Sequence, residues 1–462
     1  MFLLDVDTQT FYQIQKITID YWEWIVVFIM FMAFTFLAHR KKIIYINKQP
    51  EFRYYVWGFY AKFISSVFFV IVFYYIYQGG DTYGYFASAM SMANLFYKNP
   101  EGYFYVMTHG YSPETKSYFD FFTGYPWDYL CVEAPTYLVV KLSSPFAIIT
   151  KNSFLISNVL IGILTYRGNW KLFQLFYRYY PKISFQLAIS LLFIPSALFY
   201  GSGILKDSFT YMAACLFTVY FHDYFILKIK SMKAVFFLIL YAILMLGIKP
   251  YIFMILLPGL FFWAVFKKYD NIKNNAIRLI ILPIMILIVM GGSLLFFVSL
   301  DGVMNKFSIN NAMQTASTAQ NDLKKDYYEG ESFDIGNFDG TIPSALRLFP
   351  SAVFAGMFRP MIIEARSPLV LLSALENLFL LYLFVRIFFR ASIVKIYTTI
   401  SKDPILIFCL FFSLFFAFML GLTTSNYGAL TRFKIPMLPF FTGGLFIINY
   451  KLKELRRISL GR

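Results

Sequence analysis

Hydrophobic residues along this 462-residue chain gather in long runs, not in the alternating pattern of half-buried strands. A run of roughly 18 or more apolar residues can cross a bilayer as a helix. The strands of a membrane barrel alternate in character over about 10 residues, so the pattern excludes a barrel. We predict an all-α polytopic membrane protein with about 11 transmembrane helices. The predicted spans are residues 21–39, 57–78, 153–166, 184–200, 208–226, 234–248, 252–266, 279–299, 368–389, 404–422 and 435–450.

Composition and charge agree with a membrane protein. The chain is 59% hydrophobic and 14% charged, whereas a soluble domain is about 45–50% apolar and about 25% charged. Its net charge is +16, which in a soluble protein would suggest nucleic acid. In a membrane protein, basic residues collect in cytoplasmic loops. With the N-terminus outside, the short inner segments hold most of the Lys and Arg, so we predict an N-out, C-in topology and no nucleic-acid partner.

The organisation expected is a single transmembrane domain, 1–462, with two long outer loops at 79–150 and 301–367. Loops this long are usually functional or disordered, and the dense aromatic residues of the first loop argue against disorder. We therefore expect short helices lying in the outer membrane interface. Within the second loop, residues 312–341 are polar, acidic and contain glycine, which indicates a mobile lid.

A candidate catalytic carboxylate follows the second predicted span. Asp81 stands in GGDTYGYFASAM, directly after two glycines. A carboxylate at the membrane surface can act as a general base or contact a divalent cation. The alternative is purely structural: an Asp before a helix accepts backbone N–H bonds as its N-cap. The two roles are compatible.

Cations at outer turns depart from the usual charge bias. Lys206 and Asp207 lie in PSALFYGSGILKDSF, Lys249 in GIKPY, and Arg359 and Arg432 precede the last predicted spans. Lys206 could pair with an anionic lipid phosphate or with the adjacent Asp207, and Lys249 could be a snorkelling side chain at a helix end. Together the four cations would form a pocket for a phosphate or diphosphate.

Several segments in order along the chain resemble bacterial polytopic glycosyltransferases of the GT-C type. The resembling pieces are GDTYGYFASA, PSALFYGSGILKDS, LFPSAVFAGMFRP before a span with ENLFLLYLF, and NYGALTRFKIPMLP. Such enzymes take a sugar from a polyprenyl-phosphate donor outside the bacterial inner membrane. The resemblance implies a membrane glycosyltransferase acting on a polyprenyl-phosphate-linked sugar and on a glycan, lipid or protein acceptor, with the lipid bilayer as its surroundings.

The resemblance also implies residue roles. Asp81 takes the place of the first-loop acid, as base or metal contact, so a divalent cation is a candidate cofactor. Lys206, Arg359 and Arg432 fall where basic residues meet the lipid-linked phosphate. Many of these enzymes carry two adjacent acids in the first loop, whereas here Thr82 follows Asp81.

A second acid of the site must therefore come from farther along the first loop. Asp128 and Glu133 are the two candidates, and the sequence leaves the choice open.

Two other functions fit the same pattern of spans. An O-antigen or capsule repeat-unit polymerase would depend on Arg347 or Arg359, with Asp81 dispensable. A transporter of lipid-linked glycans predicts ionisable residues within the spans, facing a central pathway. The predicted spans hold few, chiefly Lys62 and Glu376.

Overall fold

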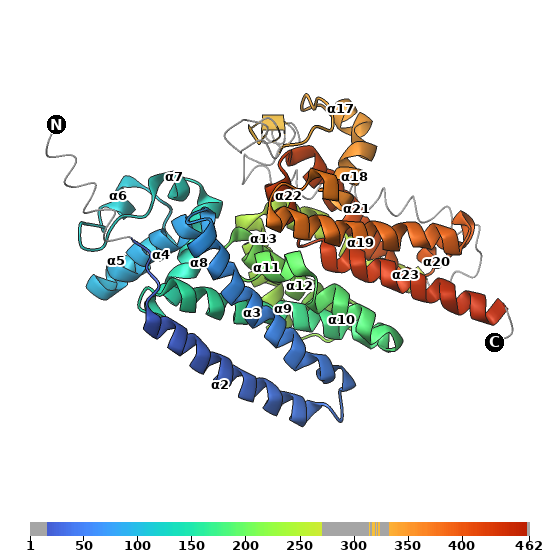
Figure 1. Cartoon of the computed structure of the whole chain (residues 1–462), viewed down its shortest axis with the longest axis horizontal. Helices are drawn as coiled ribbons and strands as arrows, with labels where there is room; N and C mark the ends of the chain where they lie inside the picture. Colours follow the sequence, from blue (N-terminus) through green and yellow to red (C-terminus); the bar gives the residue numbers. More distant parts are fainter. Residues whose placement is uncertain are drawn as a thin grey trace. The chain divides into compact units, whose positions relative to one another are not determined.

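The computed structural model describes residues 16–269, 314, 317–318, 320, 322–323 and 332–459 (Figure 1). Regular structure in these residues is helical, with one isolated antiparallel bridge between Ser332 and Asn426. The chain divides into two compact units. Unit 1 consists of Met1–Trp170, Leu198–Ala213 and Ile243–Pro250, and unit 2 of Lys171–Ala197, Ala214–Ala242 and Tyr251–Arg462.

Four of the described helices are long and apolar enough to cross a membrane: Tyr21–Tyr45, Pro50–Ile76, Pro368–Arg390 and Pro404–Thr423. Two bent helix pairs raise the number to six if each pair counts as one span. These are Ala134–Ile149 with Phe154–Tyr179, bent by 114°, and Tyr427–Phe433 with Leu438–Ile458, bent by 69°. The prediction of a helical membrane protein is confirmed at this level.

The remaining predicted spans correspond to shorter helices or lie outside the described residues. Apolar helices of 10–17 residues are Pro181–Leu192, Met232–Ile248, Pro250–Phe266 and Phe349–Phe358. The predicted span at 184–200 is interrupted, because α10 ends at Leu192 and α11 begins at Pro195. The predicted span at 279–299 falls outside the described residues.

Unit 1 carries the first predicted outer loop. Its α4 packs along α8, α5 follows α4 and α7 packs on α8. The segment 79–150 is thus largely helical, and its place in the outer membrane interface stays a prediction. The elements of this unit are α2 (Tyr21–Tyr45), η1 (Pro50–Tyr54), α3 (Tyr55–Ile71), η2 (Val72–Ile76), α4 (Asp81–Lys98), α5 (Pro100–Thr108), α6 (Pro113–Lys116), α7 (Asp128–Cys131) and α8 (Ala134–Ile149).

Besides α14 (Pro250–Tyr269), whose first residue Pro250 belongs to unit 1, four described helices contribute residues to both units. They are α9 (Phe154–Tyr179), α11 (Pro195–Tyr200), α12 (Lys206–Phe221) and α13 (Met232–Ile248).

Unit 2 is built around α21 and α23, which pack on each other, with α18 along α21 and α10, α19 and α20 along α23. The elements of this unit are η3 (Pro181–Ile183), α10 (Ser184–Leu192), η4 (His222–Ile226), α14 (Pro250–Tyr269), α17 (Ile342–Arg347), α18 (Phe349–Phe358), η6 (Ile362–Glu364), α19 (Pro368–Arg390), α20 (Ile393–Ser401), α21 (Pro404–Thr423), α22 (Tyr427–Phe433) and α23 (Leu438–Ser459).

Helices α18 and α21 approach each other at backbone contact. A Cβ on Gly356 would lie 2.1 Å from the carbonyl oxygen of Ala417, and one on Gly421 would lie 2.0 Å from that of Ala352. Small residues at a helix crossing let membrane helices gain van der Waals contact that larger side chains would prevent. This crossing positions the segment that leads to Arg359.

Candidate functional site

Asp81 is the first residue of α4 and is exposed. The N-cap position belongs to Gly80, whose φ of 94° suits glycine and is strained for other residues. The structural alternative in which Asp81 is itself the N-cap is therefore wrong. At the first position of an 18-residue helix the Asp81 carboxylate lies at the positive end of the helix dipole, where negative charge is stabilising.

The start of α4 lies against α7. A Cβ on Gly84 would come within 2.4 Å of Leu130 Cδ1 and 3.0 Å of Trp127 Cε3, so a larger residue would have to displace these side chains. One turn farther along α4, the backbone N–H of Trp127 donates to Ser88 Oγ at 3.0 Å. The helix that begins with Asp81 and the helix that begins with Asp128 are thus neighbours.

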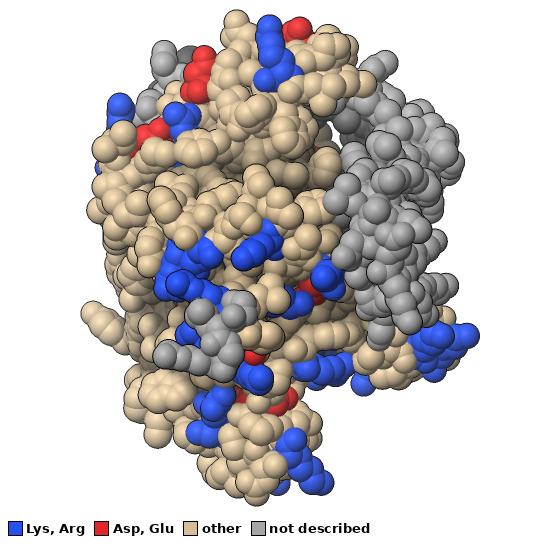
Figure 2. Space-filling model, turned by 90° about the vertical axis from the view of Figure 1, so that its right-hand side faces the viewer, with Lys and Arg blue, Asp and Glu red and all other residues tan. Residues whose placement is uncertain are grey.

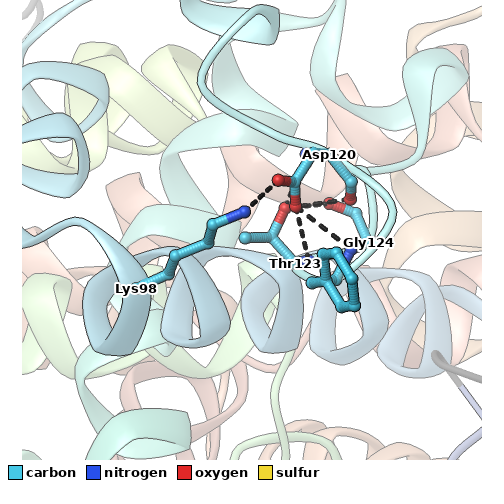
Figure 3. Close-up of polar contacts among 5 residues, drawn as sticks. Lys98, Asp120, Thr123 and Gly124 are labelled. Carbon is cyan, nitrogen blue, oxygen red and sulfur yellow. Dashed lines mark hydrogen bonds and ion pairs between the residues drawn. The ribbon is translucent and has the colours of Figure 1, made fainter.

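The loop between them is fixed to the far end of α4. Lys98 forms an ion pair with Asp120, whose carboxylate also accepts the backbone N–H groups of Phe122 and Thr123, both at 3.1 Å (Figure 3). Thr123 Oγ1 donates to the carbonyl oxygens of Asp120 and Gly124. This pair is exposed, and it gives the turn a defined conformation within the first loop.

Asp128 is a weak candidate for the second acid. Lys116 Nζ donates to its carboxylate at 2.7 Å, and Tyr111 donates its hydroxyl to the same group. The Lys116 hydrogen bond, followed by that of Tyr111, lowers the pKa of Asp128 below its usual value. A carboxylate with a lowered pKa is a poorer proton acceptor, which counts against Asp128 as a general base.

Glu133 lies beside Lys206. The Lys206 Nζ is 3.5 Å from Glu133 Oε2, with the lysine side chain 18% exposed and the glutamate 67% exposed. Glu133 also accepts from Thr136 Oγ1 at 2.9 Å. Glu133 occupies the N-cap position of α8 and Lys206 begins α12, so an exposed carboxylate and a partly buried ammonium group lie together at two helix starts.

Asp207 pairs with Lys249 and not with Lys206. Lys249 Nζ donates to Asp207 Oδ1 at 2.5 Å, and the two side chains are 8% and 0% exposed. The sequence had offered Asp207 as a partner of Lys206, and Lys249 as a snorkelling side chain at a helix end. The structure corrects both, because Asp207 and Lys249 form a buried pair with each other. The buried pair joins the first turn of α12 to the turn after α13.

Lys62 fixes the turn that precedes Lys206, a role that the sequence did not reveal. Its Nζ donates to the carbonyl oxygen of Gly201 at 2.6 Å, and Thr165 Oγ1 donates to the same oxygen at 3.0 Å. Asn158 Oδ1 accepts the Ile204 N–H at 2.9 Å. Lys62 is 1% exposed, so this side chain is a backbone anchor and not the lining of a pathway.

In unit 2, Arg359 is held from several sides. Its Nε lies 3.1 Å from Glu364 Oε1, and its guanidinium lies over the ring of Phe333 at 5.2 Å. The fully buried Lys434 donates to the Arg359 carbonyl oxygen at 2.9 Å and to Asn377 Oδ1 at 2.5 Å. Lys434 stands beside Arg432 in the basic cluster before the last predicted span, whereas Asn377, within a predicted span, was not singled out in the sequence.

The described end of the predicted lid is docked. Phe333 stacks on Tyr427 with ring centroids 5.0 Å apart, and its N–H donates to the Ser425 carbonyl oxygen at 2.8 Å. Phe338 belongs to an apolar cluster with Leu348 and Leu422. Residues 332–341 of the predicted lid therefore have defined packing contacts, most of 312–331 lies outside the described residues, and a mobile segment stays a prediction.

The predicted phosphate ligands fall into two sets. Lys206 and Lys249 belong to unit 1, with Asp81, Asp128, Glu133 and Asp207, whereas Arg359 and Arg432 belong to unit 2. Arg432 is half-buried in α22, with its guanidinium 5.1 Å from the ring of Phe433. A single pocket shared by all four cations stays a prediction.

Within the described part of the chain, no three His, Cys, Asp or Glu side chains lie close enough together to hold a metal ion. The divalent cation considered for Asp81 therefore takes no part in the chemistry proposed below. No protein-family model, no curated protein and no solved structure matches the chain. Function must be argued from the side chains themselves.

Proposed function

We propose that the chain is a membrane glycosyltransferase that moves a sugar from a polyprenyl-phosphate donor to a glycan, lipid or protein acceptor. The observation that carries this proposal is the pair of Lys206 and Glu133, a partly buried ammonium group and an exposed carboxylate at two helix starts. Asp81 supplies another exposed carboxylate in the same unit. The resemblance of the surrounding segments to GT-C enzymes supports the same assignment.

The reaction needs a site for negative charge and a proton acceptor. Lys206 and the N-terminal N–H groups of the 16-residue α12 attract the donor phosphate, because both are electropositive. When the phosphate displaces Glu133 from Lys206, a carboxylate is released beside the reacting centre. A carboxylate, Asp81 or Glu133, takes the acceptor hydroxyl proton while the acceptor oxygen bonds to the sugar carbon. The bond from that carbon to the phosphate oxygen breaks, and Lys206 stabilises the departing phosphate.

The buried Asp207–Lys249 pair and Lys62 support this site by position. They fix the turn and the first residues of α12, so the Lys206 ammonium starts from a defined place. A cation held in advance stabilises developing charge without the cost of rearrangement.

We further propose the full eleven-span topology with the N-terminus outside and the C-terminus in the cytoplasm of a bacterial inner membrane. The distribution of Lys and Arg supports it, because the short inner segments hold most of them. This topology places residues 79–150 and 301–367 on the outer face, where a lipid-linked donor is reached from outside.

The test is purification followed by native mass spectrometry and a transfer assay with synthetic polyprenyl-phosphate sugars. We expect a polyprenyl-phosphate species to co-purify, and Lys206→Met to lower its occupancy by about 10–100-fold, the worth of one charge-assisted contact. Lys98→Met is the matched control, since it removes an exposed, paired lysine of the same unit. Absence of the lipid together with no donor turnover overturns the proposal. Loss of activity in Arg347 or Arg359 variants with Asp81 variants active favours the polymerase instead.

A further inference from the structure

A second charged site lies in unit 2, at the opposite end of α19 from its first turn. A cavity of about 440 Å³ opens between the start of α10, the end of α19 and the end of α23. Pockets for small ligands have volumes of about 300–1,000 Å³, so this one is large enough for a headgroup with two phosphates. Its lining residues are Lys182, Ile183, Gln186, Leu383, Arg386, Arg390, Phe446, Asn449, Tyr450, Lys453, Glu454 and Arg457.

The cavity is strongly basic. Its cations are Lys182, Arg386, Arg390, Lys453 and Arg457, and Glu454 is the one carboxylate among its lining residues. Glu454 is itself engaged by Lys182 at 3.5 Å and by the hydroxyl of Tyr450. Figure 2, viewed from the side where α10 begins and α23 ends, shows many Lys and Arg and few acidic residues there.

The general excess of Lys and Arg in cytoplasmic segments explains why cations lie at helix ends. It does not explain why these cations surround a single cavity. Here the cations come from three separate elements and surround one hollow instead of pointing apart along the surface. Like charges held together repel one another, and an anion in the hollow removes that repulsion.

The surroundings of the cavity indicate that the anion belongs to a lipid. Ile183, Leu383 and Phe446 form an apolar wall. On α19 beside it, Phe388 and Phe389 are exposed, as expected for side chains that contact acyl chains. The chain then turns into the nine-residue α20, which exposes Ile393 and Val394, and a short helix with an exposed apolar face lies in the membrane interface. These exposed apolar side chains are consistent with a cavity at headgroup depth.

We propose that this cavity binds the phosphate headgroup of an anionic lipid, with the acyl chains along α19. The shared recognition chemistry is a phosphate group held by Arg forks and Lys ammonium groups. Basic pockets between transmembrane helices are suited to such headgroups. In the topology proposed above, the bound lipid comes from the cytoplasmic leaflet. This site is separate in its residues from Asp81, Glu133 and Lys206.

The test compares lipid retention by the purified full chain in detergent, using cardiolipin and phosphatidylcholine as probes and native mass spectrometry as readout. We expect cardiolipin to be retained in preference. Arg386→Gln with Arg457→Gln should weaken cardiolipin retention roughly 5-fold per cation, or roughly 25-fold together. Glu454→Gln should strengthen it, because that change removes the one carboxylate. Raising the salt to 1 M should weaken it.

The matched control is Arg40→Gln with Lys48→Gln, which removes the same charge from exposed positions of unit 1. Equal retention in this control and in the unchanged protein, with loss in the cavity variant, supports the proposal. No preference for cardiolipin, or equal loss in both double variants, overturns it. A second arm titrates inorganic pyrophosphate without lipid: tight pyrophosphate binding without cardiolipin retention overturns the lipid as the source of the phosphate. Melting temperatures confirm that each variant is folded.

Discussion

At the scale of single residues, the Asp207 carboxylate and the Lys249 ammonium are removed from water together. Taking one partner away leaves a buried charge without compensation, which costs about 3–5 kcal/mol. We expect Lys249→Met to destabilise the protein by about that amount. The double variant with Asp207→Asn should recover a large part of the loss. Thermal melting in detergent measures both.

The control is the exposed pair of Lys98 and Asp120, which Figure 3 shows. Exposed pairs are worth about 0–1 kcal/mol, so Lys98→Met should leave the melting temperature almost unchanged. A Lys249→Met loss as small as this would contradict a stabilising role for the buried Asp207–Lys249 pair.

Substitution of Asp81 distinguishes a catalytic role of its carboxylate from a structural role at the start of α4. Since Gly80 holds the cap position and Asn keeps the size of Asp, Asp81→Asn should fold and enter the membrane normally. If Asp81 takes the acceptor proton, transfer should fall by about 10²–10⁴-fold. The measurement is transfer from a synthetic polyprenyl-phosphate sugar at equal protein content. Near-normal transfer would assign the base to Glu133, and Glu133→Gln is the variant that then tests it.

The candidate residues were found in the sequence, but their pairings were not. Lys206 and Asp207 are adjacent in the chain, yet their partners Glu133 and Lys249 come from other helices. Adjacent residues on a helix point in different directions, so only the fold decides which charges meet. The sequence shows Lys62 as a charge within a predicted span. Its acceptor is the backbone carbonyl of Gly201, which a pattern of side chains cannot predict.

At the scale of elements, the crossing of α18 and α21 depends on Gly356 and Gly421. A methyl group on Gly421 would meet backbone and not a movable side chain. We expect Gly421→Ala to destabilise the protein by about 1–3 kcal/mol, the usual cost of overpacking. Thermal melting measures it.

Gly443→Ala is the matched control for this crossing. Gly443 also lies within a buried helix, α23, but an added Cβ would be 3.5 Å from Phe176 Cε1, an ordinary contact. Without a clash, replacing Gly by Ala stabilises by about 0.4–1 kcal/mol. The two substitutions should therefore have opposite signs, and equal effects would count against the close crossing.

The hydrophobic runs in the sequence predicted where the long helices lie. They did not predict where the helices bend. The predicted short span at 153–166 is part of α9, which joins α8 at an angle of 114°. Lys151 and Asn152 make this bend with φ values of 51° and 64°. Such left-handed residues are uncommon outside glycine, and hydropathy carries no information about them. By contrast, the prolines that begin α5, α19 and α21 are sequence signals of a helix start.

At the scale of the whole molecule, the proposed topology places the first loop and the turn before α13 on opposite sides. The native cysteines Cys131, Cys215 and Cys409 are buried and give little background. A cysteine at the exposed Phe122 should react with an impermeant maleimide in intact spheroplasts. One at the exposed Met232 should react only after permeabilisation. Labelling of Met232→Cys in intact cells, or protection of Phe122→Cys, would reverse the topology.

The contact between Lys62 and Gly201 also bears on how the protein is made. The two residues are 139 positions apart. At about 5–20 residues per second, the ribosome reaches Gly201 roughly 7–28 s after Lys62. For that interval α3 carries a lysine whose acceptor has not been synthesised, and a lone lysine at a helix centre costs about 2.5–3.5 kcal/mol to insert. We therefore expect the second span to leave the insertion machinery later than a span without a lysine, and Lys62→Met to release it to lipid earlier.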